Sequence, residues 1–159
     1  MSGALQIQGL LLTPLPVIQD ERGAVLHMLR SDAPEYTRFG ECYFSEVNPG
    51  AIKAWKRHRL QTQNLAVPIG RIRIVICDVL EDSRTRGRLD LIELGRPDAY
   101  ARLRIPPGLW YGFIGLGSTT ALVANCADAP HDPLESEGLA LPRLGAPALE
   151  LLRSGRRVS

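Results

Sequence analysis

The chain has 159 residues, of which 45% are hydrophobic, 23% charged and 6% aromatic, and its formal net charge is +2. This size fits one domain over residues 1–159, with a core over about 9–135 and a C-terminal extension over 136–159. The small charge argues against a nucleic-acid or membrane-surface protein, and neither a membrane span nor a signal peptide is visible, so we expect a cytoplasmic protein with its three cysteines reduced.

Strand-like segments dominate the chain. They are short, rich in Val, Ile and Leu, and separated by Gly, Pro, Asp or Ser. In chain order, strands are expected at 51–55, 65–69, 72–80, 89–94, 101–105, 109–114 and 120–126. The best helix signal is at 148–153, after Pro147 near the C-terminus. This pattern predicts an all-β sandwich or barrel.

Two stretches carry the information about function. Residues 50–70 read GAIKAWKRHRLQTQNLAVPIG and contain Lys56, His58 and Gln63, and residues 106–111 read PPGLWY and end at Tyr111. Their order and spacing resemble the two motifs of cupins. We therefore expect a small cupin jelly-roll barrel.

The residue types at these positions argue against a metal. Positions 56 and 58 share one face of a strand, where metal-binding cupins carry imidazole ligands. Lys56 supplies an ammonium, which cannot ligate a metal, and Gln63 supplies a neutral amide in place of a carboxylate. Only His58 remains as a good ligand, so we expect no catalytic metal and no cofactor.

The order of motifs resembles the dTDP-4-dehydrorhamnose 3,5-epimerase family, which consists of metal-free cupins, over roughly residues 9–135. The similar stretches are DERG at 20–23, IKAW at 52–55, IPPGLWYGF at 105–113 and PHDP at 130–133. The resemblance implies a homodimer and a divergent, metal-free epimerase or isomerase of a 4-keto-6-deoxy sugar nucleotide. The alternative is a barrel that binds a sugar nucleotide or another small anion without turning it over.

The family reaction removes a proton alpha to a ketone and returns one to the opposite face, which requires a base and an acid. The resemblance implies a His–Asp base, whose position falls on Lys56, and a Tyr acid, whose position falls near Ala124 or Asn125. We expect Lys56 or His58 to remove the proton and Tyr111 to protonate or polarise the substrate. Lys56 is either a desolvated lysine with a lowered pKa or a partly exposed lysine that binds an anion or a carboxylate.

Five of the seven residues 53–59 are Lys, Arg or His. On a regular strand, residues 53, 55, 57 and 59 would share one face and residues 54, 56 and 58 the other. Cationic side chains suit diphosphate oxygens, although a solvated or dimer-facing basic strand is the alternative. The expected substrate-binding residues are Arg22, Lys53, Gln63, Asn64, Arg73 and Asn125.

Overall fold

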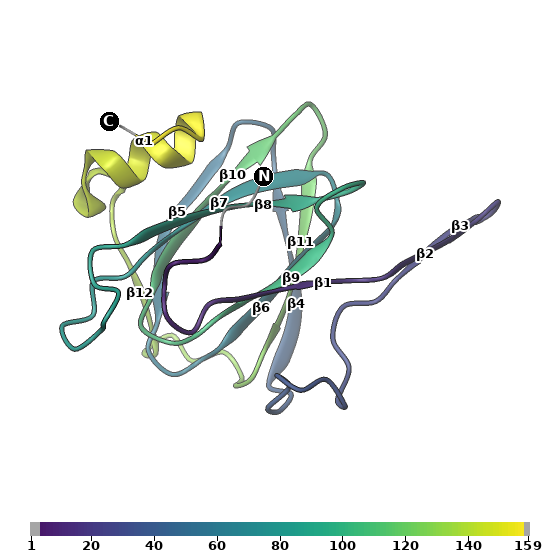
Figure 1. Ribbon diagram of the computed structural model, residues 1–159, viewed down its shortest axis with the longest axis horizontal. Coiled ribbons are helices and arrows are strands. Elements are labelled where there is room, and N and C mark those ends of the chain that lie inside the picture. Colours follow the sequence, from purple (N-terminus) through teal and green to yellow (C-terminus); the bar gives the residue numbers. More distant parts are fainter. Residues whose placement is uncertain (1–3, 158–159) are drawn as a thin grey trace.

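The computed structural model in Figure 1 describes residues 4–157; the first three and last two residues of the expected domain lie outside the described part. Two antiparallel five-stranded sheets enclose the core. The first sheet has the order β1 (Leu11–Pro14), β9 (Ala101–Ile105), β6 (Gln63–Ile69), β11 (Ala121–Ala127) and β4 (Glu41–Val47). The second has the order β12 (Ser136–Gly138), β5 (Ile52–His58), β10 (Trp110–Leu116), β7 (Arg71–Cys77) and β8 (Leu89–Gly95).

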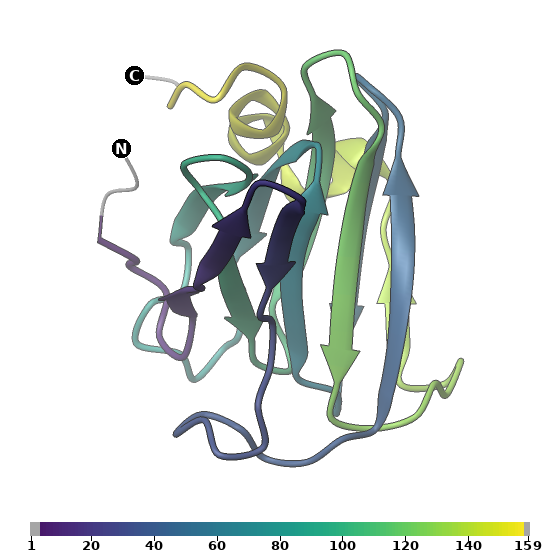
Figure 2. The same cartoon turned by 90° about the vertical axis from the view of Figure 1, so that its right-hand side faces the viewer.

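The core between the sheets follows from the alternation of side chains along the strands. In β7, Ile72, Ile74 and Ile76 are fully buried, whereas Arg71 and Arg73 lie on the other face. A second apolar cluster covers the outer face of the second sheet, where Trp55 and Trp110 pack against helix α1 (Ala146–Ser154). Figure 2 shows this helix beside the sheet, after the short helix η1 (Leu141–Leu144).

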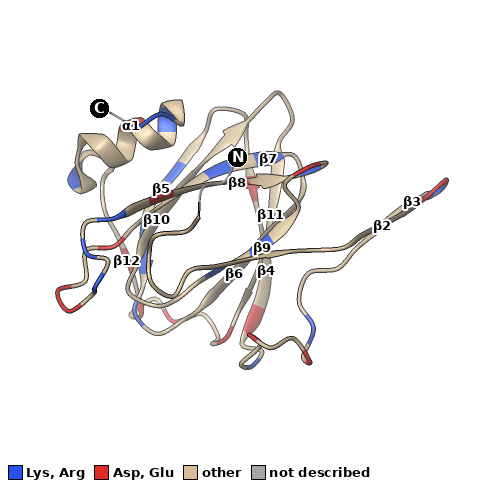
Figure 3. Ribbon diagram, in the orientation of Figure 1, with Lys and Arg blue, Asp and Glu red and all other residues tan. Residues whose placement is uncertain are grey.

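The hairpin of β2 (Val17–Asp20) and β3 (Gly23–Leu26) projects away from the barrel (Figure 1). Its apolar side chains Ile18 and Val25 are 57% and 59% exposed. Charged residues mark its tip (Figure 3), where Arg22 forms an ion pair with Asp20. Within residues 4–157, no helix has the length and hydropathy needed to cross a membrane.

The predicted all-β fold is confirmed, and each of the seven expected strands corresponds to an observed one. The expected strand at 72–80 is too long, because Asp78 leaves the sheet and its carboxylate accepts hydrogen bonds from Ser83 and Thr85. The expected strand at 51–55 is too short, since β5 continues to His58. The expected helix at 148–153 lies within α1, while strands β1 to β4 and β12 were not expected.

Candidate active site

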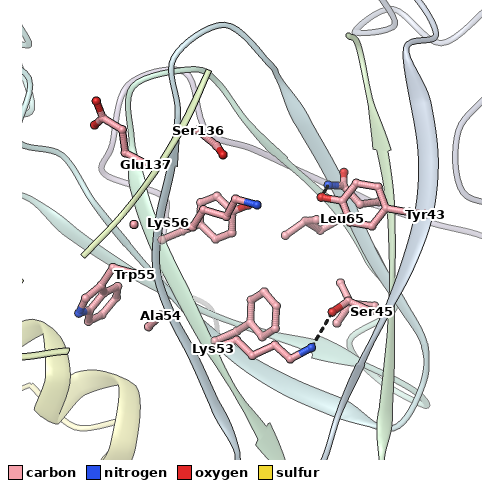
Figure 4. A pocket seen from close by; sticks show the side chains of 14 residues that line it. Tyr43, Ser45, Lys53, Ala54, Trp55, Lys56, Leu65, Ser136 and Glu137 are labelled. Atoms are coloured by element: carbon pink, nitrogen blue, oxygen red, sulfur yellow. Dashed lines mark hydrogen bonds between the residues drawn. The ribbon is translucent and has the colours of Figure 1, made fainter. Parts of the chain in front are cut away.

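A cavity of about 370 Å³ lies between the two sheets and opens to solvent. Strands β5 and β10 form one wall, and strands β4, β6 and β11 form the other (Figure 4). The polar side chains that line it and that matter for chemistry are Tyr43, Ser45, Lys53, Lys56, Tyr111 and Asn125.

Both Lys53 and Lys56 line this cavity, so the prediction that they occupy opposite faces of the strand is wrong. The cause is a bulge in β5: Lys56 pairs with Tyr111 and Lys53 with Phe113, so three steps on β5 match two on β10. Gly112 lies at this irregularity, where a Cβ would come within 2.3 Å of the Ala54 Cβ. The close approach of the two strands therefore requires a glycine at position 112.

The two lysines differ in their contacts. Lys53 Nζ donates a hydrogen bond to Ser45 Oγ across the cavity at 2.9 Å (Figure 4). Lys56 is exposed, and among residues 4–157 its ammonium has no hydrogen-bond or ion-pair partner. This exposure argues against a lysine that is desolvated inside the barrel. It favours a lysine at the mouth of the cavity that is available to bind an anion.

The neighbouring arginines have a different role from the lysines. Arg57 and Arg59 both bind the carboxylate of Glu137 on β12, and the Arg57 guanidinium lies 4.8 Å from the Trp110 ring centroid. The Glu137 side chain points away from the cavity (Figure 4). These ion pairs fasten β12 to β5, so the basic cluster is divided between structural arginines and cavity lysines.

His58 is buried, and its Nδ1 forms a hydrogen bond with the Glu135 carboxylate. Because the carboxylate accepts, Nδ1 carries the hydrogen and Nε2 keeps its lone pair. That Nε2 is buried and has no hydrogen-bond partner among the described residues. Burial lowers the pKa of His58, with Lys56 adding to the effect, and Glu135 only partly opposes it. His58 is therefore a neutral imidazole at neutral pH, which is the form a general base needs.

Glu135 is held as a carboxylate. Burial raises its pKa, but hydrogen bonds from His58 and from the backbone N–H groups of Leu60 and Gln61 outweigh this and leave the pKa lowered. A fixed carboxylate behind an imidazole sets the tautomer of the ring and stabilises its protonated form. Sequence reasoning missed Glu135 because it considered only aspartates as partners for a histidine base.

Tyr111 stacks on His58 with ring centroids 6.2 Å apart and planes inclined by 15°. Its ring is buried, and desolvation, followed by the nearby Tyr43 and Glu135, raises the pKa of its hydroxyl. The hydroxyl therefore stays protonated at neutral pH and can donate a hydrogen bond to a substrate oxygen.

The opposite wall carries a second tyrosine. The Tyr43 hydroxyl accepts a hydrogen bond from Asn125 Nδ2 at 2.9 Å, and burial raises the pKa of this hydroxyl. Figure 4 shows Tyr43 across the cavity from Lys56. Sequence reasoning missed Tyr43 and Ser45 because the strand that carries them, β4, was not expected.

The three expected amides lie together. Asn125 Nδ2 also donates to Gln63 Oε1, Gln63 Nε2 donates to Gln61, and Asn125 Oδ1 accepts the Asn64 backbone N–H. Of the three expected residues, only Asn125 lines the cavity, whereas Gln63 and Asn64 are buried behind it. This network fixes the amide that holds Tyr43.

Two expected binding residues lie elsewhere. Arg22 is at the tip of the β2–β3 hairpin, far along the projection from the barrel (Figure 1). Arg73 binds Glu93, and its Nη1 donates to the carbonyls of Leu152 and Arg153 at the end of α1. The described chain thus brings Lys53, Lys56, Tyr111 and Asn125 to one cavity, with His58 behind Tyr111, but leaves both arginines outside it.

Comparison with known proteins adds evidence on the family. Residues 4–145 match the family model described as dTDP-4-dehydrorhamnose 3,5-epimerase. A probable low-salt glycan biosynthesis epimerase from Haloferax volcanii is 38% identical over 113 residues, 70% of this chain and 72% of that protein. A spore coat polysaccharide biosynthesis protein from Bacillus subtilis is 29% identical over 136 residues, 86% of this chain and 89% of that protein.

Solved structures agree with these matches. A dTDP sugar isomerase from Desulfovibrio desulfuricans G20 has 50% sequence identity and a TM-score of 0.87, over 93% of this chain and 99% of that one. A dTDP-4-dehydrorhamnose 3,5-epimerase from Bacillus anthracis shares the fold, with 21% identity and a TM-score of 0.77 over 89% of this chain and 85% of that one. The predicted cupin jelly roll and the predicted resemblance are both confirmed.

Proposed function

The chain belongs to the dTDP-4-dehydrorhamnose 3,5-epimerase family, and we propose that it epimerises or isomerises a 4-keto-6-deoxy sugar nucleotide in polysaccharide or glycan biosynthesis. A dTDP sugar isomerase that is 50% identical over almost its whole length supports this substrate class, as do the epimerase and polysaccharide biosynthesis relatives. The observation that carries the proposal is the buried His58–Glu135 pair. Its imidazole is neutral and stacks on Tyr111, and its Nε2 has no hydrogen-bond partner among residues 4–157.

The first step is removal of a proton alpha to the ketone. His58 does not line the cavity and its Nε2 is buried behind Tyr111, so Nε2 takes the proton through one bridging water. The electrons of the broken C–H bond form the C=C bond of an enolate whose charge rests on the former carbonyl oxygen. Glu135 stabilises the imidazolium that results, because it is an adjacent carboxylate. The Lys56 ammonium and the Tyr111 hydroxyl stabilise the enolate oxygen, one as a free cation and the other as a protonated donor.

Inversion requires a proton from the other face of the sugar. Tyr43 is a tyrosine on the opposite wall from β5 and β10, and Asn125 orients its hydroxyl. It gives its proton to the alpha carbon and regains one from solvent at the open side of the cavity. If the proton is delivered instead to the former carbonyl carbon, the same groups perform an isomerisation. In that case the hydroxyl on the alpha carbon loses its proton and becomes the new ketone, and the former carbonyl oxygen gains a proton and becomes a hydroxyl.

The diphosphate is bound by cations at the mouth of the cavity. Lys53 is the best placed, since its ammonium already reaches across to Ser45. Arg22 can contribute to such a site only if the hairpin of another subunit reaches it. No metal takes part in this scheme, because Lys56 occupies the position where a cupin metal ligand would stand.

The assembly we propose is a homodimer. The β2–β3 hairpin exposes Ile18 and Val25 on a projection that the barrel itself does not cover, and Phe44 on the edge strand β4 is 64% exposed. Covering such apolar residues and strand edges is a common reason for pairing of β-proteins. Sedimentation equilibrium at micromolar concentration tests this; a monomer at all concentrations would contradict it.

The test of the activity is solvent isotope exchange. The protein is incubated with dTDP-4-keto-6-deoxyglucose in D₂O, and the sugar protons are followed by NMR. Deuterium at C3, C5 or both supports the proposal and identifies the carbon. If no label appears but the nucleotide still raises the midpoint of thermal unfolding, the protein binds the sugar nucleotide without turning it over, and the proposed activity is wrong.

A further inference from the structure

Two thiols face each other outside the cavity. Cys42 of β4 and Cys126 of β11 are paired in register, and their Sγ atoms are 3.6 Å apart. All three cysteines of the chain are free, and the third, Cys77, is buried in β7. Cys42 and Cys126 therefore form a pair, and Cys77 lies apart from both.

The backbone already has the separation that a disulfide needs. Directly opposite residues of antiparallel strands have Cα atoms about 4.5–5.5 Å apart, which lies inside the range of about 4.4–6.8 Å that disulfides span. Small side-chain rotations of Cys42 and Cys126 are then enough to join the sulfurs. We propose that these two residues form a reversible oxidation site, which takes up a disulfide on reaction with a low-molecular-weight disulfide such as oxidised glutathione.

The surroundings set the order of reaction. Cys42 is exposed, whereas Cys126 is half-buried, with its Sγ 4.0 Å from Met28 Sδ. Burial, then the contact with Cys42, raises the pKa of Cys126 to about 11. The thiolate of Cys42 is thus the attacking group.

The chemistry balances in two exchanges. Cys42 attacks one sulfur of glutathione disulfide, which forms a mixed disulfide and releases one glutathione thiolate. Cys126 then loses its proton and attacks the Cys42 sulfur, which releases the second glutathione. Overall the two protein thiols are oxidised to one disulfide, and the glutathione disulfide is reduced to two thiols.

The site adjoins the wall of the cavity. Cys42 precedes Tyr43 and Cys126 follows Asn125, and these two pairs are successive partners in the β4–β11 ladder. Side chains alternate along strands, so the thiols lie on the outer face and Tyr43 and Asn125 on the inner face. A disulfide would fasten β4 to β11 directly behind the residues that we assign to proton delivery.

The test equilibrates the reduced protein with excess oxidised glutathione and measures the intact mass and the thiols after unfolding. The expected result is loss of two hydrogens and a fall from three titratable thiols to one, with a peptide map joining Cys42 to Cys126. Retention of all three thiols, or a disulfide between two chains on a non-reducing gel, would overturn the proposal.

Single variants separate the two roles. Cys126→Ser is expected to stop at the mixed disulfide, with one glutathione bound at Cys42, whereas Cys42→Ser is expected to react slowly or not at all. Cys77→Ala is the control, because burial raises the pKa of Cys77 to about 12 and its removal should leave the loss of two hydrogens unchanged. If each of the two single variants, Cys42→Ser and Cys126→Ser, still formed an intramolecular disulfide, Cys77 would be the reacting partner. That result would refute the assignment of the site to Cys42 and Cys126.

Discussion

His58 and Tyr111 stack almost in parallel across the β5–β10 pair, so each ring forms part of the surroundings of the other. Both are buried, which makes truncation to alanine a test of packing as much as of chemistry. Variants that keep size and shape are therefore the informative ones. Asn for His58, Gln for Glu135 and Phe for either tyrosine meet this condition.

His58→Asn is expected to reduce the rate of deuterium exchange about 10²- to 10⁴-fold, the usual contribution of a general base. Glu135→Gln should reduce it less, because the imidazole remains but its orienting carboxylate is lost. Circular dichroism and the midpoint of thermal unfolding check that each variant is folded. Exchange at the parental rate in folded His58→Asn would assign the base elsewhere, with Lys56 the next candidate.

Activity should be full at pH 7 and should fall as His58 takes up a proton. Since the folded pKa of His58 is lowered from 6.5, the midpoint of this acid limb should lie below pH 6.5. The fold should also lose stability as the pH falls below 6.5, because the unfolded chain binds this proton first. Glu135→Gln should move the acid limb to still lower pH, since it removes a carboxylate that favours the charged ring. pH–rate profiles of both proteins from pH 4.5 to 8 measure the acid limb and its shift, and urea unfolding over the same range measures the stability. An upward move of the limb in Glu135→Gln would disprove the coupling between Glu135 and His58.

The two tyrosines should separate exchange from inversion. Tyr43→Phe should retain deuterium exchange at the alpha carbon but lose the epimerised product, because the base side is intact and the opposite proton donor is gone. Tyr111→Phe should slow both exchange and epimerisation, since the Tyr111 hydroxyl stabilises the enolate through which both proceed. NMR follows label and configuration in the same sample. Parental epimerisation by Tyr43→Phe, with exchange present, would remove Tyr43 from the mechanism while leaving the enzyme proposal in place.

The two cavity lysines should differ in the kinetic parameter that they change. Lys53→Met should weaken dTDP binding about 10- to 100-fold, the equivalent of one charge-assisted hydrogen bond, with little change in kcat. Lys56→Met should lower kcat, because the cation that it removes acts on the enolate. Arg59→Met is a control with the same change in charge, on a side chain bound to Glu137. Equal effects of all three on KM would mean that only net charge matters.

Gly112→Ala should destabilise the fold by about 1–3 kcal/mol, as overpacking does. Its Cβ would lie 2.3 Å from the Ala54 Cβ, at the bulge that brings Lys53 into the cavity. Gly138→Ala on β12 is the matched control, since its Cβ would meet only the Trp55 carbonyl at 3.9 Å. Urea unfolding compares the two, and equal midpoints would show that the bulge tolerates a side chain.

The sequence was sufficient to predict the barrel because its central strands combine apolar alternation with glycine and proline turns, and β7 is the best example. It could not predict β4, since its exposed residues and the glutamates at positions 41 and 46 mask its inward-facing alternation. The face of Lys53 was not predictable either, because a bulge depends on the partner strand, here through Gly112. Glu135 lies far from His58 in the chain, and only the pairing of β12 with β5 brings them together.

Because Trp55 and Trp110 pack against α1, the intrinsic tryptophan fluorescence of the chain reports on this part of the structure. These are its two tryptophans, and they directly precede Lys56 and Tyr111 in the sequence, on the outer side of the strands that line the cavity. The Trp55 indole also donates a hydrogen bond to the Leu141 carbonyl at 2.9 Å. Intrinsic fluorescence therefore monitors β5, β10 and the docking of the C-terminal segment, so titration with a nucleotide can be followed without a label.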